Sequence, residues 1–205
     1  MALPSNSVEE DVFSWVVDGK KCNGFSAAHT WSSLRPCQPT KSWFNSIWFK
    51  GAIPKHAFLM WIAQLNRLPT RIRLASWGMS VPTDCCLCSA VAENRDHLFL
   101  TCDYSSEIWR SIQSRLNLRH HFFLSWDELL SWMRTSTKSA PKILRKISAH
   151  AAIYCLWRQR NNVLHNLQSI PAASIFKEID KLVRNIITTR RQRKYFGVMM
   201  PLWLK

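Results

Sequence analysis

Glycine, acidic residues and long apolar segments are all scarce in this chain of 205 residues. Five glycines are too few for a β fold rich in tight turns, so the composition favours helices. The longest apolar runs, at 57–63 and 151–157, are far shorter than the roughly 20 residues that span a bilayer, so we expect no membrane segment. The N-terminus lacks a basic segment followed by an apolar run, and we expect an intracellular, reduced and soluble protein without a signal peptide.

Carboxylates that could converge on catalytic metal ions are also missing. Enzymes that act through two metal ions need several such side chains in one place. The sequence has no Asp-Asp pair, and its adjacent acids, Glu9-Glu10-Asp11 and Asp127-Glu128, lie in polar contexts typical of exposed segments. We therefore expect a protein that is not an enzyme.

Positive charge is concentrated in the C-terminal third. The formal net charge is +15, yet residues 1–133 hold 13 Lys and Arg against 11 Asp and Glu, whereas residues 134–194 hold 14 against 2. A field of that sign attracts polyanions, most commonly nucleic acid, with an anionic membrane or an acidic protein as less common partners. A solvated helical surface would show the same pattern.

The pattern of apolar residues predicts a mainly α fold that begins with a small strand or hairpin. Apolar and polar residues alternate from Val12 to Val17 before the turn at Asp18-Gly19, and Ser26 is placed to cap a short helix that ends at Leu34. Further helices are predicted at 41–49, 54–65, 71–77, 106–116, 126–133, 142–165 and 172–194.

Proline and hydroxyl residues mark several predicted helix starts. Pro54 suits the first turn of a helix, and the apolar run that follows it is so continuous that we expect this helix to be central. Thr70 is expected to cap the next helix, and Ser105 or Ser106 the one that follows the last clustered cysteine.

Four of the seven cysteines lie within residues 85–102. Cys85, Cys88, His97 and Cys102 form the pattern C-x2-C-x8-H-x4-C, and zinc takes four such Cys and His ligands in a tetrahedron. A redox C-x-x-C pair would follow a strand in a βαβ unit, and no such unit is indicated here. The spacing therefore predicts one structural zinc ion with no open coordination position.

Cys86 offers a second way to fill the site. Cys86 and Cys88 are a rival pair with one intervening residue, a spacing that suits a tetrahedral chelate less well, so we interpret Cys86 as a bystander thiol. The cysteines outside the cluster are interpreted as ordinary core or surface residues: Cys22, Cys37 and Cys155.

Two stretches resemble a known family, the zinc-binding domain of reverse transcriptases from plant non-LTR (LINE-type) retrotransposons. The first is "WFNSIWFKGAIPKHAFLMWIAQLNRLPTRIRLASWGM" at 43–79 and the second is "CCLCSAVAENRDHLFLTCDYSSEIW" at 85–109. A third, "LWRQRNNVLHN" at 156–166, is similar to the W-x-x-R-N segment that precedes an RNase H-like domain in many members. Leu100, Asn94 and the extra thiol of Cys86 depart from the family pattern.

The resemblance implies the same four zinc ligands, Cys85, Cys88, His97 and Cys102. It also implies a non-catalytic module of a larger polyprotein, with the reverse transcriptase and RNase H domains of that polyprotein as partners, and a nuclear location with the cytoplasm as a second compartment. The expected domains are a hairpin with a short helix (1–40), the zinc-binding domain (41–134) and, after a linker at 135–141, a basic helical hairpin (141–195).

RNA or single-stranded DNA is the expected ligand of the basic helices. The predicted contacts are cations that lie opposite the apolar stripe of helix 172–194 or at the end of that helix. They are Lys177, Lys181, Arg184, Arg190, Arg191, Arg193 and Lys194. "RRQRK" at 190–194 also matches a nuclear localisation signal. The alternative function is a structural spacer, or a relic of one, that positions neighbouring polymerase and RNase H domains without binding nucleic acid.

Overall fold

The computed structural model describes residues 13–35 and 38–204, and the chain divides into two compact units, 1–41 and 42–205. Val12, where the predicted strand begins, and Cys37 lie outside the described residues. The expected zinc-binding domain and basic helical hairpin both lie in the second unit. Within the described ranges, no helix is long and apolar enough to cross a membrane.

The first unit is a hairpin followed by a helix, as the sequence predicted. Asp18 and Gly19 connect the strands with φ angles of 50° and 72°, and a two-residue hairpin loop of this kind needs positive φ at both positions. The Ser26 hydroxyl accepts a hydrogen bond from the N–H of His29 at 3.3 Å, which caps the helix. The elements are β1 (Trp15–Val17), β2 (Lys20–Cys22), paired antiparallel, and α1 (Ala27–Leu34).

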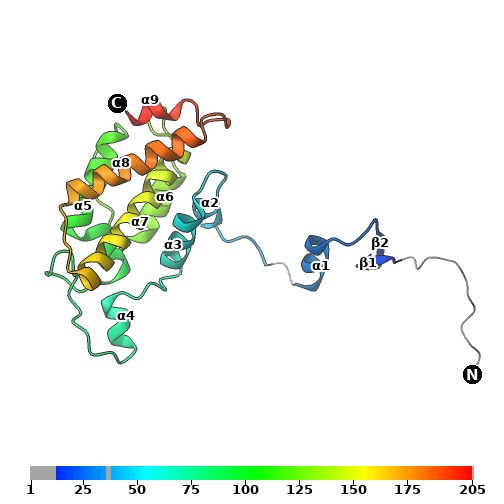
Figure 1. Cartoon of the computed structure of the whole chain (residues 1–205), viewed down its shortest axis with the longest axis horizontal. Coiled ribbons are helices and arrows are strands. Elements are labelled where there is room, and N and C mark those ends of the chain that lie inside the picture. The colour runs from blue at the N-terminus through cyan, green and yellow to red at the C-terminus, as the bar shows by residue number, and fades with distance from the viewer. Residues whose placement is uncertain (1–12, 36–37, 205) are drawn as a thin grey trace, which may run out of the picture. The chain divides into compact units, whose positions relative to one another are not determined.

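The second unit is helical and contains the long C-terminal helices (Figure 1). Its elements are α2 (Phe44–Ile47), α3 (Pro54–Gln64), α4 (Arg71–Ser76), the π-helix η1 (His97–Thr101), α5 (Asp103–Arg115), α6 (Trp126–Arg134), α7 (Lys142–Asn166), α8 (Ala172–Thr189) and α9 (Met199–Trp203).

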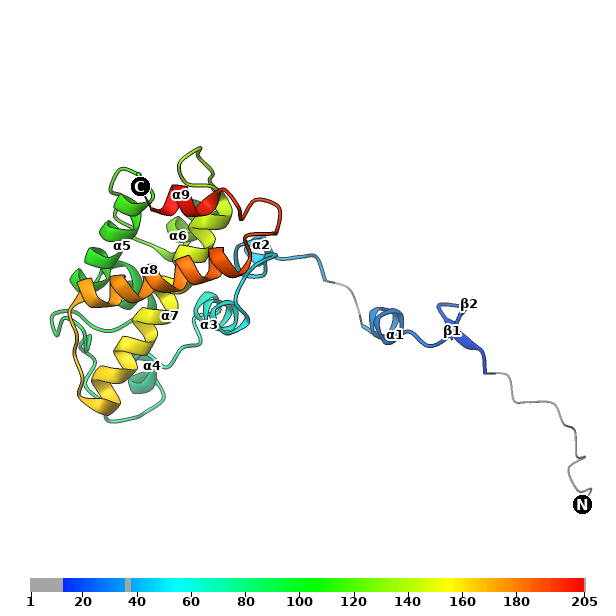
Figure 2. The same cartoon turned by 45° about the horizontal axis from the view of Figure 1, so that its top comes forward.

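The central helix is α7, which packs against α3, α5, α6, α8 and η1 (Figures 1 and 2). Ten successive residues of α7, 144–153, are buried, as expected for a helix that is covered all round. The prediction of a central helix at 54–65 is therefore wrong. Pro54 does start α3, but this helix buries only the face that carries Ala57, Met60 and Ala63, and it leaves Phe58 54% exposed.

Two cations of the basic segment are structural. Arg145 is 4% exposed and donates hydrogen bonds to the carbonyl of Ala140 and the hydroxyl of Thr135, which hold the loop between α6 and α7. Lys146 is 8% exposed, and its Nζ donates to the carbonyl of Asn45. Their charge is satisfied inside the protein and is not available to a polyanion.

Predicted helix boundaries differ from the observed ones at three places. The N-cap residue of α5 is Cys102, which makes no side-chain cap bond, while the hydroxyls of Ser105 and Ser106 donate back to carbonyls of η1. Thr70 is the N-cap residue of α4 but makes no side-chain cap bond. α8 ends at Thr189, five residues before its predicted end, and a turn leads to α9, a helix that the sequence did not predict.

Two histidines are buried next to one another in the core. His56 is 1% exposed, stacks on the Tyr154 ring at 4.3 Å, and has no hydrogen-bond partner for either ring nitrogen within the described part of the chain. Burial lowers the pKa of His56 to about 4, and that of His150, which bonds the Ser46 carbonyl, to about 4 as well. Both side chains are therefore neutral in the folded protein near pH 6.

We expect His56 to weaken the protein in acid. Because its pKa is lowered in the folded state, the unfolded chain takes up the proton first, and the free energy of unfolding falls as the pH drops from about 6.5 towards 4, by about 3 kcal/mol for this group. His56→Phe, which keeps the stacking ring and removes two unpaired nitrogens, should show less loss over that range. Urea unfolding at several pH values measures the difference in pH dependence between the variant and the natural protein. His120→Phe, at an exposed position, is the control. Equal pH dependence of His56→Phe and the natural protein would contradict the prediction.

Candidate metal centre

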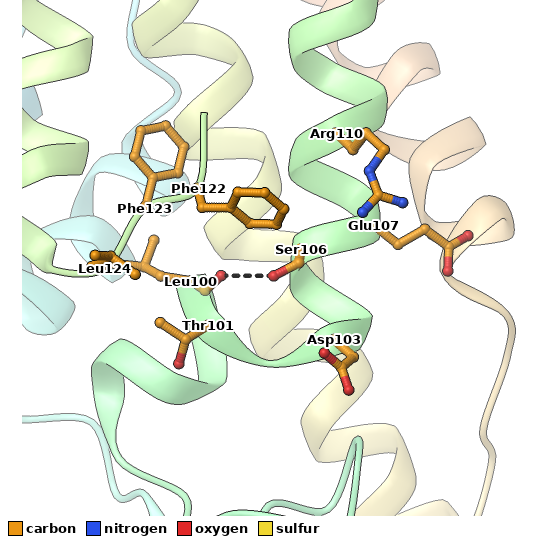
Figure 3. A pocket seen from close by; sticks show the side chains of 9 residues that line it. All are labelled: Leu100, Thr101, Asp103, Ser106, Glu107, Arg110, Phe122, Phe123 and Leu124. Atoms are coloured by element: carbon orange, nitrogen blue, oxygen red, sulfur yellow. Dashed lines mark hydrogen bonds between the residues drawn. The ribbon is translucent and has the colours of Figure 1, made fainter. Parts of the chain in front are cut away.

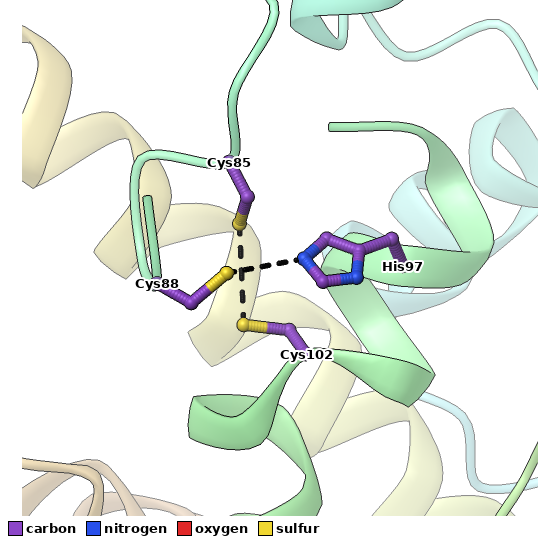
Figure 4. A group of neighbouring side chains, drawn as sticks. All are labelled: Cys85, Cys88, His97 and Cys102. Atoms are coloured by element: carbon purple, nitrogen blue, oxygen red, sulfur yellow. Dashed lines mark hydrogen bonds between the residues drawn. The ribbon is translucent and has the colours of Figure 1, made fainter. Parts of the chain in front are cut away.

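Four side chains with metal-binding atoms converge in the second unit (Figure 4). The ligand atoms of Cys85, Cys88, His97 and Cys102 all lie within 4.8 Å of one another. The sulfur atoms of Cys85 and Cys102 are 3.9 Å apart, and the Cys88 sulfur is 3.3 Å from Nε2 of His97. These are the four residues that the spacing selected.

A short hairpin-like loop positions the first two cysteines. Asp84 and Ala92 form an isolated antiparallel bridge, and the Cys85 N–H donates to the Val91 carbonyl at 2.7 Å. The N–H groups of Leu87 and Cys88 bond the Cys85 sulfur. A turn of this kind presents both sulfurs of a C-x-x-C pair on one side of the backbone.

The π-helix η1 joins the other two positions. The Cys102 N–H donates to the His97 carbonyl at 2.8 Å, a bond between residues five apart, so both side chains face the same side of the turn, which an α-helix would not allow. Nδ1 of His97 lies 3.3 Å from the Thr101 hydroxyl, which leaves Nε2 to face the sulfurs. Asn94, a departure from the family pattern, accepts a hydrogen bond from the N–H of His97 through its side-chain oxygen at 2.7 Å. A Ser or Thr side chain at such a position can accept the same kind of bond.

The thiols of Cys85 and Cys102 influence one another. Their mutual contact lowers the pKa of Cys85, with help from backbone N–H groups, and it raises the pKa of Cys102 together with burial. The two thiols therefore resist simultaneous ionisation unless a cation lies between them. Cys102 is also the N-cap residue of α5, a position where the helix dipole favours a negative charge.

The donor set fits a tetrahedral metal ion. A zinc ion with sulfur about 2.3 Å and nitrogen about 2.0 Å away holds its ligand atoms about 3.5 to 3.8 Å apart. The Cys85–Cys102 and Cys88–His97 distances of 3.9 and 3.3 Å are close to these values. Cys85 and Cys102 are fully buried and His97 is 7% exposed, whereas Cys88 is half-buried, so the cluster meets solvent on the Cys88 side only.

Cys86 is not a member of the cluster. Its sulfur lies 3.8 Å from the carbonyl of Arg160 on α7, and burial raises the pKa of the Cys86 thiol to about 12. A thiol that stays protonated and faces away from the other sulfurs is a poor metal ligand.

Glu93 and Arg160 form a fully buried ion pair next to the cysteine loop. Arg160 donates to Oε1 of Glu93 from Nε at 3.1 Å and from Nη2 at 2.8 Å, and the two side chains are 4% and 0% exposed. Glu93 also accepts the N–H of Arg71 at 3.0 Å, which supplies the cap that Thr70 does not give to α4. Sequence reasoning missed this pair, because nothing local in the sequence links residues 67 positions apart.

The predicted nucleic-acid contacts are divided between α8 and the turn after it. Lys177 and Lys181 are exposed on α8, whereas Arg184 pairs with Asp180. Arg190 is half-buried, and the exposed cations of the turn are Arg191, Arg193 and Lys194. The structure thus divides the seven residues between a helix and the turn that follows it, and commits Arg184 to an ion pair.

Breaking the Glu93–Arg160 pair should destabilise the protein strongly. Glu93→Gln and Arg160→Met each leave one buried group without its partner, and we expect a loss of about 3–5 kcal/mol in the free energy of unfolding. The double variant should lose less than the sum of the two. Urea unfolding of the metal-loaded proteins measures the cycle, and Glu178→Gln, in the half-exposed pair with Arg158, is the matched control with an expected loss below about 1 kcal/mol. Single losses as small as the control's would contradict the expectation.

Comparison with known proteins agrees with this geometry. Residues 25–109 match a family model described as zinc-binding in reverse transcriptase, a range that includes all four clustered side chains. No curated protein and no solved structure matches the chain significantly. The segment from residue 25 to residue 109 is therefore similar to the zinc-binding domains of reverse transcriptases.

Proposed function

We propose that this protein is a non-catalytic module in which one zinc ion holds the fold and exposed cations bind RNA or single-stranded DNA. The zinc ligands are Cys85, Cys88, His97 and Cys102. The observation that carries the zinc assignment is the convergence of these four donors, three of them buried, with all ligand atoms within 4.8 Å of one another.

The bound zinc ion stabilises the fold by cross-linking the cysteine loop, η1 and α5. Four protein ligands leave no open position for water, which is the property of structural rather than catalytic zinc sites. The matched family is likewise a zinc-binding domain and not the polymerase domain itself.

Exposed positive charge supports nucleic-acid binding. Within the described residues, Arg184 is the one member of the seven predicted contacts that forms an ion pair. Five exposed cations remain for phosphates, because Arg190 is half-buried: Lys177, Lys181, Arg191, Arg193 and Lys194. Contacts of this kind are independent of sequence and weaken steeply with salt.

The proposal includes the origin and location of the module. We infer a source in a plant LINE-type retrotransposon, a place between the reverse transcriptase and RNase H domains of its polyprotein, and action in the nucleus. The support is the family match and the W-x-x-R-N segment, in which Arg160 ties α7 to the zinc loop through Glu93.

A structural spacer is the second candidate. The burial of large aromatic side chains favours it, because Trp109, Trp126 and Trp203 are at most 2% exposed and build a platform rather than a stacking surface. Both functions share the zinc site and differ in nucleic-acid binding.

The purified protein should contain one zinc ion per chain. Cys88→Ser should lose the ion and destabilise the region around residues 80–110, because three remaining ligands do not close the tetrahedron. Cys86→Ser is the matched control and should keep the ion, since its sulfur faces α7. Native mass spectrometry measures the content; no metal, two metals, or equal loss in both variants would contradict the assignment.

Binding to single-stranded RNA should depend on the exposed cations of α8 and of the turn after it. We expect the triple variant Lys177→Ala, Lys181→Ala and Arg191→Ala to bind more weakly and to reduce the slope of log affinity against log salt by about 2, since each lost phosphate contact contributes about 0.7. Substitution is the right test, because removal of residues 170–205 would strip α8 from α5 and α7.

Fluorescence anisotropy over a salt series measures this, with single-stranded DNA as a parallel ligand. The charge-matched control in the first unit is Lys20→Ala, Lys21→Ala and Arg35→Ala, three exposed residues. If the natural protein binds neither ligand at low salt, the nucleic-acid function is wrong and the spacer is favoured.

A further inference from the structure

Two adjoining cavities near the start of α7 form a groove that the sequence analysis did not find. They measure about 520 and 330 Å³ and share Ile143 and Tyr195 in their walls. Four cations line them: Lys50 with Arg193 and Lys194 in the larger cavity, and Lys142 in the smaller. We call this surface the Tyr195 groove. It lies outside the assigned zinc site.

The groove is assembled from three segments that are distant in sequence. Phe196 is 2% exposed and packs on Gly51, where a side-chain Cβ would lie 2.6 Å from the aromatic ring. Gly51 also has a φ of 107°, which favours glycine. This close packing fixes Lys50 beside the turn that carries Arg193 and Lys194.

The charge of the groove is of one sign. No carboxylate is among the residues that line either cavity, and no ion pair within residues 13–35 and 38–204 involves any of the four cations. The cavity beside α5 provides a contrast, because two carboxylates, Asp103 and Glu107, line it with the single cation Arg110 (Figure 3). Of these surfaces, the Tyr195 groove is the one that is complementary to a polyanion.

Tyr195 gives the groove an exposed aromatic face. Its side chain is 62% exposed, and its φ of 77° is uncommon for a residue with a bulky side chain. Such backbone conformations cost about 1–3 kcal/mol and are concentrated at functional sites. Nζ of Lys194 lies 5.4 Å from the centre of the ring, so a stacking surface and a cation occur side by side.

We infer that the Tyr195 groove binds single-stranded nucleic acid, with a base stacked on Tyr195 and backbone phosphates against the four cations. The inference rests on the proposed nucleic-acid function and gives that function a site. Aromatic stacking combined with a cationic track is the way in which proteins bind single strands, whereas a duplex keeps its bases stacked on each other. Lys50 and Lys142 belong to the site although neither was among the contacts predicted from the basic C-terminal segment.

The test uses fluorescence anisotropy with a labelled oligouridine of about 12 nucleotides and the full-length, zinc-loaded protein. Lys50→Ala/Lys142→Ala should weaken binding at least about 10-fold and lower the salt slope by about 1.4, for two phosphate contacts. Arg67→Ala/Arg119→Ala, which removes two exposed cations elsewhere, should change affinity less than about 3-fold.

Tyr195 separates stacking from charge. Tyr195→Ala should weaken binding about 5- to 100-fold without changing the salt slope, and Tyr195→Phe should restore it. Circular dichroism checks that each variant is folded. Oligodeoxyuridine compares DNA with RNA, and a duplex of equal length should bind more weakly and be insensitive to Tyr195→Ala.

Two results overturn the inference in different ways. If the natural protein binds no single strand at low salt, the groove and the proposed nucleic-acid function both fail. If it binds, and the α8 triple variant weakens binding while the Lys50/Lys142 and Tyr195→Ala variants match the Arg67/Arg119 control, the groove is wrong and the proposed function stands.

Discussion

The buried carboxylate of Glu93 connects the parts on which the candidate metal centre depends. It pairs with Arg160 of the central helix, caps α4 through the N–H of Arg71, and lies in the loop that carries Cys85 and Cys88. Because that loop is held against α7, the Cys86 sulfur faces the Arg160 carbonyl, away from the cluster. An isolated peptide with the same four ligands would lack this support, so the zinc-binding segment and the C-terminal helices stabilise one another.

Burial divides the basic residues into two groups with different roles. Arg145, Lys146 and Arg160 lie in the core of α7 and hold a loop, α2 and the zinc loop through hydrogen bonds. The exposed cations that we propose as phosphate contacts lie on α8, in the turn after it, and around the Tyr195 groove. Net charge alone therefore overestimates the surface available to a polyanion, and the location of each cation decides what it does.

Local signals in the sequence predicted local structure. Ser26 and Pro54 marked helix starts correctly, Asp18-Gly19 marked the hairpin, and the cysteine and histidine spacing identified the cluster, because each depends on residues close in sequence. The central position of α7, the cap from Glu93, the early end of α8 and helix α9 depend on contacts between distant segments, which periodicity does not record. The π-helix lies between these two groups. The H-x4-C spacing alone does not predict it, but a π-helical turn follows once both residues are required to face one metal site.

The central claim is that a single zinc ion is held by three sulfurs and one nitrogen. X-ray absorption at the zinc edge tests it most directly, because the spectrum counts sulfur and nitrogen neighbours. The account predicts three sulfur atoms at about 2.3 Å and one nitrogen at about 2.0 Å, with no water ligand. Four sulfur neighbours, which would require Cys86, or a spectrum dominated by oxygen would contradict it.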